Sequence, residues 1–210
     1  MDKKNEEFQL KTWRGYDFFE VASALQKEIR RGNEHDALYW AFQMIPDYEK
    51  YLWKRLKIIV NEDIGLAYPM AIVLVQTLSE QYFEVRQKKG ADATLFIANA
   101  IMIMCRAPKS RVADHFVMMM MQKIAQKKIY LEIPDYALDQ HTKAGKKKGR
   151  GWEHFREIGS QITPKDESVE DPYEEEAYEL LKNFKHWNLA TGFHRDKKNK
   201  EDKNGKLFKT

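Results

Sequence analysis

The sequence has very little cysteine. Cys105 is the one cysteine among 210 residues, and it lies within an apolar stretch. A lone thiol cannot build a disulfide framework, which fits a reducing cytosol, and we expect a cytoplasmic protein. The six histidines are scattered and give no pair at zinc-ligand spacing. His141 and His154 could meet in space, although hydrogen bonding or exposure explains them better, so we expect no metal.

Long hydrophobic runs are also missing. The longest apolar runs, near 70–75 and 95–105, fall well short of the roughly 20 residues that a membrane-spanning helix needs. The first seven residues are polar and lack the apolar core of a signal peptide. We therefore expect neither export nor insertion into a membrane.

A phosphate-binding loop is missing as well. Such a loop has the pattern G-x-x-x-x-G-K-[ST], in which the hydroxyl holds magnesium. Gly145 is followed by Lys146 and Lys147, and Gly205 by Lys206 and Leu207, so neither glycine precedes the required pair. The sequence predicts no ATP hydrolysis and no bound cofactor.

Other catalytic constellations have simpler explanations. Cys105 and His115 could form a nucleophile and a base, but cysteine in an apolar helix usually behaves as a small hydrophobe. Glu62 and Asp63 are adjacent, and neighbours on a helix point about 100° apart, so they cannot share one proton. We expect no catalytic residue and no enzyme activity.

The chain does contain strong helical periodicity. Hydrophobic residues make up 43% and charged residues 32% of the chain, enough for a core with solvated faces. Stripes of apolar residues at spacings of three and four predict one helix after another. The expected helices cover 17–31, 34–45, 48–63, 69–88, 92–106, 108–127 and 172–187. The segment 92–106 is apolar on most sides, so we place it at the centre of the domain.

The predicted fold class is mainly α, a bundle of about six to seven helices with a short extended segment near 129–133. Glycine, proline and charge runs divide the rest of the chain. The expected organisation is a flexible lead-in (1–15), a helical domain (16–133), a basic glycine-rich loop region packed on that domain (134–163), an acidic C-terminal helix (164–190) and a disordered lysine-rich tail (191–210).

Three stretches together resemble one family. Residues 17–40, 61–69 and 106–110 are similar, in order and spacing, to the region that follows the ATPase core in the RarA, MgsA and Werner-helicase-interacting protein family of clamp-loader-like AAA+ ATPases. The match covers about residues 16–112. The family carries its ATP-binding core ahead of this region, and here only about fifteen residues precede the match. The resemblance therefore indicates a stand-alone C-terminal, collar-like region.

The resemblance implies a collar-like helical bundle, assembly into a homotetramer, and work at stalled replication forks or single-stranded gaps. Expected partners are further copies of this chain, a separately encoded AAA+ ATPase, and single-stranded or forked DNA. An alternative is a protein-interaction scaffold without affinity for nucleic acid. The sequence offers no support for a third alternative, an enzyme of unknown type.

A run of methionines marks a candidate oligomer interface. Consecutive helical positions cover every side of a helix, so some of these side chains must face outward or meet a partner, and methionine adapts readily to such surfaces. A helix buried on all sides is the alternative. The candidate residues are Phe116, Val117, Met118, Met119, Met120 and Met121.

Two acids predict a structural clasp. Glu62 and Asp63 lie near a helix C-terminus, where the helix dipole disfavours negative charge. We expect Arg106 and Lys109, in the third of the resembling stretches, to compensate them and to fix the angle between two helices. Alternatively, both acids are simply solvated.

A basic segment is the candidate nucleic-acid site. Lysines can neutralise phosphates, and an aromatic ring can stack on an unpaired base. A plain solvated loop is the alternative, and the acidic run 166–179 could also fold over the segment and mask it. The candidate residues are Lys143, Lys146, Lys147, Lys148, Arg150 and Trp152.

Overall fold

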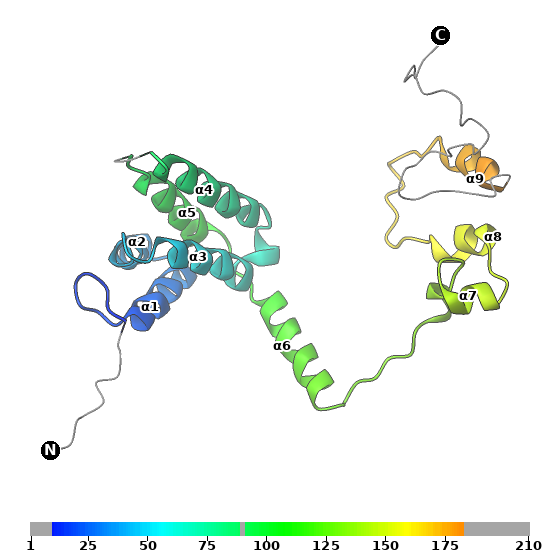
Figure 1. The fold of residues 1–210 in the computed structure, drawn as a ribbon, viewed down its shortest axis with the longest axis horizontal. Helices are drawn as coiled ribbons and strands as arrows, with labels where there is room; N and C mark the ends of the chain where they lie inside the picture. The colour runs from blue at the N-terminus through cyan, green and yellow to red at the C-terminus, as the bar shows by residue number, and fades with distance from the viewer. Residues whose placement is uncertain (1–9, 89–90, 183–210) are drawn as a thin grey trace, which may run out of the picture. The chain divides into compact units, whose positions relative to one another are not determined.

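The computed structural model describes residues 10–88 and 91–182, with side chains through residue 180. The chain divides into two compact units, residues 1–130 and residues 131–210. Each unit has its own helices, which Figure 1 labels along the chain.

The first unit is built from helices throughout, so the predicted mainly α fold is confirmed. Five helices pack into a bundle, and a sixth extends away from it (Figure 1). In chain order they are α1 (Phe18–Arg31), α2 (Glu34–Gln43), α3 (Glu49–Asp63), the 3-10 turn η1 (Gly65–Ala67), α4 (Met70–Arg86), α5 (Thr94–Arg106) and α6 (Val112–Ala125).

Helix α1 shows how the sequence sets these elements. Asp17 caps its N-terminus, because its carboxylate accepts hydrogen bonds from the backbone N–H of Phe19 and Glu20 at 2.8 and 3.0 Å. Gly32 ends the helix with a φ of 80°, a left-handed conformation that suits glycine. The predicted apolar stripe of α1 is buried: Phe18, Val21, Ala22, Leu25 and Ile29.

Helix α5 lies at the centre of the bundle, as its apolar composition predicts. It packs against α1, α2, α3 and α4. Ile97, Ile101 and Met104 have no exposed surface, and they meet core residues such as Trp53 of α3 and Tyr82 of α4. The Trp53 and Tyr82 ring centroids lie 5.3 Å apart. Burial of such large side chains supplies most of the stability of the bundle.

Residues 10–17, most of which belong to the predicted lead-in, contact the bundle. Thr12 is buried, and Lys11 and Asp17 form an isolated antiparallel bridge. The Tyr48 hydroxyl donates a hydrogen bond to the Lys11 carbonyl at 3.0 Å. This short turn therefore covers one end of α1 and the start of α3.

Helix α6 begins four residues later than the sequence predicts. The Lys109 ammonium donates hydrogen bonds to the carbonyls of Met104, Cys105 and Ala107 at 2.8, 2.9 and 2.6 Å. It thereby satisfies carbonyls that the end of α5 leaves free. The Ser110 N–H donates to the Asp63 carbonyl at 2.9 Å. These bonds hold the residues between α5 and Val112 in a non-helical link, so α6 starts at Val112.

The second unit consists of short helical turns and one longer helix. Its elements are η2 (Asp135–Ala137), α7 (Lys143–Lys147), α8 (Trp152–His154), the π turn η3 (Phe155–Gly159) and α9 (Glu174–Lys182). The predicted last helix, 172–187, is therefore present as far as residue 182. Residues 183–187 and the predicted tail, 191–210, lie outside the described residues.

One feature of the second half differs from the prediction, namely the helical turn within the basic segment that was expected to be a loop. The segment 129–133 forms neither helix nor strand, and its Tyr130, Leu131 and Ile133 side chains are exposed. The basic segment contains α7 (Lys143–Lys147). Thr142 is the N-cap of this helix, and its hydroxyl accepts a hydrogen bond from the Gly145 N–H at 3.0 Å.

Within residues 10–88 and 91–182 no β-strand forms, apart from the single bridge near residue 11. In the same part of the chain, no helix combines the length and the apolar character needed to cross a membrane.

Candidate functional site

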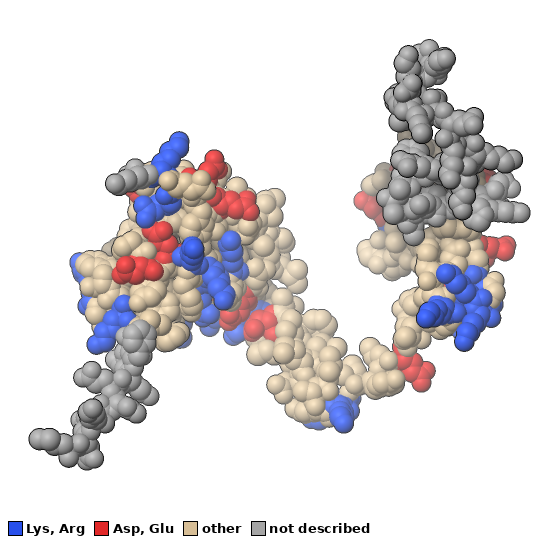
Figure 2. Space-filling view, viewed as in Figure 1, with Lys and Arg blue, Asp and Glu red and all other residues tan. Residues whose placement is uncertain are grey.

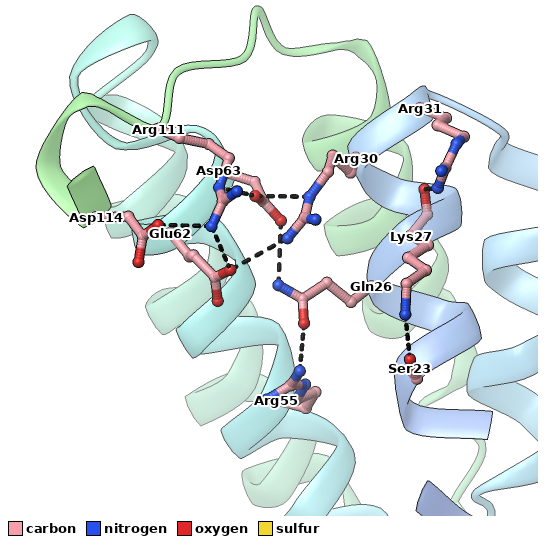
Figure 3. A network of polar contacts seen from close by, with 10 residues as sticks. All are labelled: Ser23, Gln26, Lys27, Arg30, Arg31, Arg55, Glu62, Asp63, Arg111 and Asp114. Carbon is pink, nitrogen blue, oxygen red and sulfur yellow. Dashed lines mark hydrogen bonds and ion pairs between the residues drawn. The ribbon is translucent and has the colours of Figure 1, made fainter. Parts of the chain in front are cut away.

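The C-terminus of α3 carries a buried carboxylate. The Asp63 side chain has no exposed surface, and its Oδ1 atom lies 2.9 Å from Arg30 Nε and 3.5 Å from Arg111 Nε. Its Oδ2 atom accepts a hydrogen bond from Gln26 at 3.3 Å. Figure 3 shows these side chains converging from α1, from α3 and from the residues that precede α6.

The neighbouring acid extends the same network. Glu62 Oε1 lies 3.1 Å from Arg30 Nη2 and 3.4 Å from Arg111 Nη2. Arg111 also contacts Asp114 of α6 at 2.5 Å. Arg30 bridges two carboxylates and Arg111 contacts three, a task that suits the planar fork of a guanidinium. The network thus fixes the end of α3 against α1 and against the start of α6.

The predicted clasp is right about the acids and wrong about the cations. Arg106 pairs instead with Glu34 of α2, at 2.5 and 3.1 Å, and this hydrogen bond lowers the pKa of the Glu34 carboxyl. Lys109 is occupied by the carbonyls at the end of α5, and burial lowers the pKa of its ammonium. The stretch 61–69 still contacts the end of the stretch 106–110, through Ser110 and the next residue, Arg111.

Cys105 behaves as part of the core. The side chain is buried at the end of α5, and burial raises the pKa of the thiol to about 11. A thiol of this kind is a poor nucleophile at neutral pH. Among the described residues, no group of three or more His, Cys, Asp or Glu side chains is arranged to hold a metal ion.

The methionine run lies on α6, and none of the residues of α6 is buried. Phe116 is 60% exposed, Met121 64% and Ile124 61%. Figure 2 shows α6 as a mostly uncharged surface. Of the predicted interface residues, Phe116, Val117, Met118, Met119 and Met121 are exposed and Met120 is half-buried. The alternative of a helix buried on all sides is wrong for this chain.

A second group of exposed apolar side chains lies beside α6. Leu66 of η1 is 70% exposed, and Met70 and Val73 of α4 are 53% and 57% exposed. Residues of α6 contact η1. The apolar surface of α6 therefore continues onto the neighbouring turn and toward the start of α4, and monomeric proteins rarely expose such large apolar patches.

The basic segment is organised around one acid. Asp135 contacts Lys148 at 2.6 Å and also pairs with Arg150. The hydrogen bonds from Lys148 and Arg150 lower the pKa of Asp135 to about 2. Arg150 further donates to the carbonyls of Asp135 and Leu138 at 2.7 and 2.8 Å. Both cations are thus engaged in holding the segment together.

The other predicted nucleic-acid residues divide into two groups. Lys143, Lys146 and Lys147 are exposed, and no acid in the described part of the chain pairs with them. Trp152 is half-buried and meets His141 and Phe155 edge-on, at centroid distances of 5.8 and 5.7 Å. Among the described residues, three lysines therefore have no acid partner, and the tryptophan packs into an aromatic cluster.

The described part of the chain is thus mainly helical, and its first unit carries a buried arginine–carboxylate network and an exposed apolar helix. A family model described as the MgsA AAA+ ATPase C terminal matches residues 32–189, and the chain belongs to that family. The match includes α2 through α9, and hence α6, the basic segment and the α3 and Arg111 part of the network, while Gln26 and Arg30 of α1 lie before it.

Several relatives of known sequence share this region. The chain is 32% identical over 139 residues to the replication-associated recombination protein A of Bacillus subtilis. The aligned part covers 63% of this chain and 31% of that protein. It is 28% identical over 143 residues to the protein of the same name in Escherichia coli, and this alignment covers 67% of this chain and 31% of that protein. The ATPase WRNIP1 of Dictyostelium discoideum is 27% identical over 161 residues, with 71% and 17% covered.

The chain therefore spans about a third or less of the length of these relatives.

Sequence reasoning missed Arg30, Arg111 and Asp135. Arg111 directly follows one of the three resembling stretches, so its position was a usable signal. Arg30 lies in the last turn of α1, where a cation suits the helix dipole, and a cation at a helix end is also free to meet an acid of another helix.

Proposed function

We propose that this chain is an assembly domain that associates with copies of itself through α6 and acts together with a AAA+ ATPase in replication-associated recombination. The observation that carries the proposal is the exposure of α6, in which no residue is buried although apolar side chains cover most of the helix. The family membership and the names of the relatives support the recombination context.

The energetics favour burial of this surface. Removing one large apolar side chain from water contributes about 1.5–3 kcal/mol, and α6 offers several. Phe116, Met121 and Ile124 are each more than half exposed. The exposed Leu66 of η1 and Met70 of α4 add to the apolar surface of α6, so that three elements contribute to it. We infer a homotetramer, the state that the family resemblance implies.

The test compares two exposed apolar residues. Phe116→Glu, on α6, should reduce the mass measured by light scattering from that of a tetramer to that of a monomer. A charge buried in an apolar interface has no partner to compensate it, so the copies should separate. The helical bundle should stay folded in the tetramer and in the monomer. Leu95→Glu on α5 is the matched control, since Leu95 is 70% exposed and lies outside the patch.

The control variant should keep the tetramer, and both variants should keep the circular dichroism of the parent chain. A Phe116→Glu variant that stays tetrameric would refute α6 as the interface. Loss of the tetramer in both variants would show that the effect is not specific to α6.

A second function, binding of single-stranded DNA by the second unit, is favoured by one observation. Lys143, Lys146 and Lys147 lie on or next to one turn of α7 and have no acid partner among the described residues. Unpaired lysines of this kind release counterions when they meet phosphates. The scaffold without nucleic-acid affinity remains the alternative.

Fluorescence anisotropy with a labelled oligothymidine decides between these alternatives. Changing the three lysines to alanine should weaken binding and should lower the salt slope by about 0.7 for each lost phosphate contact. The same change at Lys123, Lys127 and Lys128, which are also exposed, should have little effect. No binding by the unchanged chain would favour the scaffold.

A further inference from the structure

A groove with a basic rim and an apolar floor lies between α3 and α4. It has a volume of about 510 Å³ and is open to solvent. The basic rim comes from α3 alone, whereas the apolar floor comes from both α3 and α4. The lining residues are Lys50, Trp53, Lys54, Lys57, Ile58 and Phe83.

The rim is a stripe of three lysines. Lys50, Lys54 and Lys57 follow one another at spacings of four and three, so they share one face of α3. Within residues 10–88 and 91–182 none of the three forms an ion pair. Figure 2 shows lysine and arginine side chains gathered over α3. Like charges at this spacing destabilise a helix, and a negatively charged ligand relieves that repulsion.

The floor is apolar. Ile58 is 41% exposed, Phe83 is partly buried, and Trp53 is 1% exposed. Within the described part of the chain, the buried Trp53 indole N–H has no hydrogen-bond acceptor. The groove can therefore receive an apolar side chain between the lysines and the α4 helix.

We propose that this groove is a docking site for an acidic peptide that carries an aromatic or branched aliphatic anchor. Charge complementarity comes from the three lysines, and the anchor occupies the apolar floor. Single-stranded nucleic acid fits less well, because base stacking requires an exposed aromatic face and Trp53 is buried. The groove uses no residue of α6 or α7, so this site is separate from the assembly surface and from the α7 lysines.

The experiment uses the full chain and a labelled peptide, Asp-Glu-Asp-Phe-Leu-Asp-Glu-Asp, in fluorescence anisotropy. The Lys50→Gln, Lys54→Gln, Lys57→Gln variant should weaken binding about tenfold, since it removes three exposed charge pairs. Ile58→Ser should also weaken binding, because the floor loses an apolar contact. A peptide with Ser-Ser in place of Phe-Leu should bind more weakly to the unchanged chain.

The matched control replaces three exposed lysines elsewhere. Lys143→Gln, Lys146→Gln, Lys147→Gln should leave peptide binding unchanged, which separates the groove from general attraction to basic surfaces. The proposal is overturned if the unchanged chain does not bind the peptide, or if the α3 and α7 variants weaken binding equally. It is also overturned if the α3 changes weaken binding of oligothymidine but not of the peptide.

Discussion

Asp63 and Arg30 form an ion pair between α3 and α1, in which Arg30 Nε lies 2.9 Å from a carboxylate that has no exposed surface. Arg111, just before α6, reaches the same carboxylate from another side. The position of α6 relative to the bundle therefore depends on a charge inside the bundle. A buried charge of this kind is stable only while its partners remain.

Asp63→Ala should lower the free energy of unfolding by about 3 kcal/mol, at the low end for a broken buried pair, because Arg30 and Arg111 keep some contact with water. Urea denaturation followed by circular dichroism measures this change. Asp36→Ala, at an exposed acid, should change stability by less than about 0.5 kcal/mol. Equal effects of the two changes would contradict the structural role of Asp63.

Two glycines of the second unit should respond differently to alanine. A Cβ atom at Gly145 would lie 1.8 Å from the Asp139 carbonyl oxygen, whereas one at Gly151 would meet nothing within 4 Å. We expect Gly145→Ala to disrupt the turn around α7, at a cost of about 1–3 kcal/mol or more. Hydrogen exchange of the amides in residues 142–150 should accelerate in this variant and stay unchanged in Gly151→Ala.

The α7 segment should lose order in acid. The folded-state pKa of Asp135 is lowered to about 2 by hydrogen bonds from Lys148 and Arg150, whereas an unfolded aspartate titrates near about 3.9. A lowered pKa contributes stability that is present above the unfolded value and is lost as pH falls through the folded value. The protection of the amides in residues 142–150, expressed relative to the intrinsic exchange rate at each pH, should therefore fall between about pH 4 and pH 2. Asp135→Asn should remove this dependence.

Cys105 should resist thiol reagents in the folded chain. Burial raises its pKa to about 11, so the thiolate fraction at pH 8 is far below that of a free cysteine, whose pKa is about 8.5. A spectrophotometric disulfide reagent should react slowly in buffer and rapidly in urea. Fast reaction with the folded chain would contradict the burial of this side chain.

Local signals in the sequence were enough to predict the helices. The apolar stripe of α1 is a short-range feature, and it appears in the structure, where Asp17 caps the helix and Gly32 ends it. The central place of α5 followed from its apolar composition, because only a helix covered on most sides can bury such a surface. Exposure on α6 could be expected for part of the helix but not for all of it.

Partners that come from distant parts of the chain could not be predicted in the same way. Glu62 and Asp63 needed cations, yet the sequence does not show that Arg30 faces them while Arg106 faces Glu34. That choice depends on how α1, α2, α3 and α5 are rotated in the bundle. The turn around α7 likewise depends on contacts between Asp135 and cations more than ten residues away.

The central claim is that α6 is covered by further copies of the chain. Light scattering of the unchanged chain over a range of concentrations tests this claim most directly, with circular dichroism to show that the chain is folded. The account predicts a mass of four chains that falls toward one chain only on dilution. A folded chain with the mass of one chain at every concentration would contradict it.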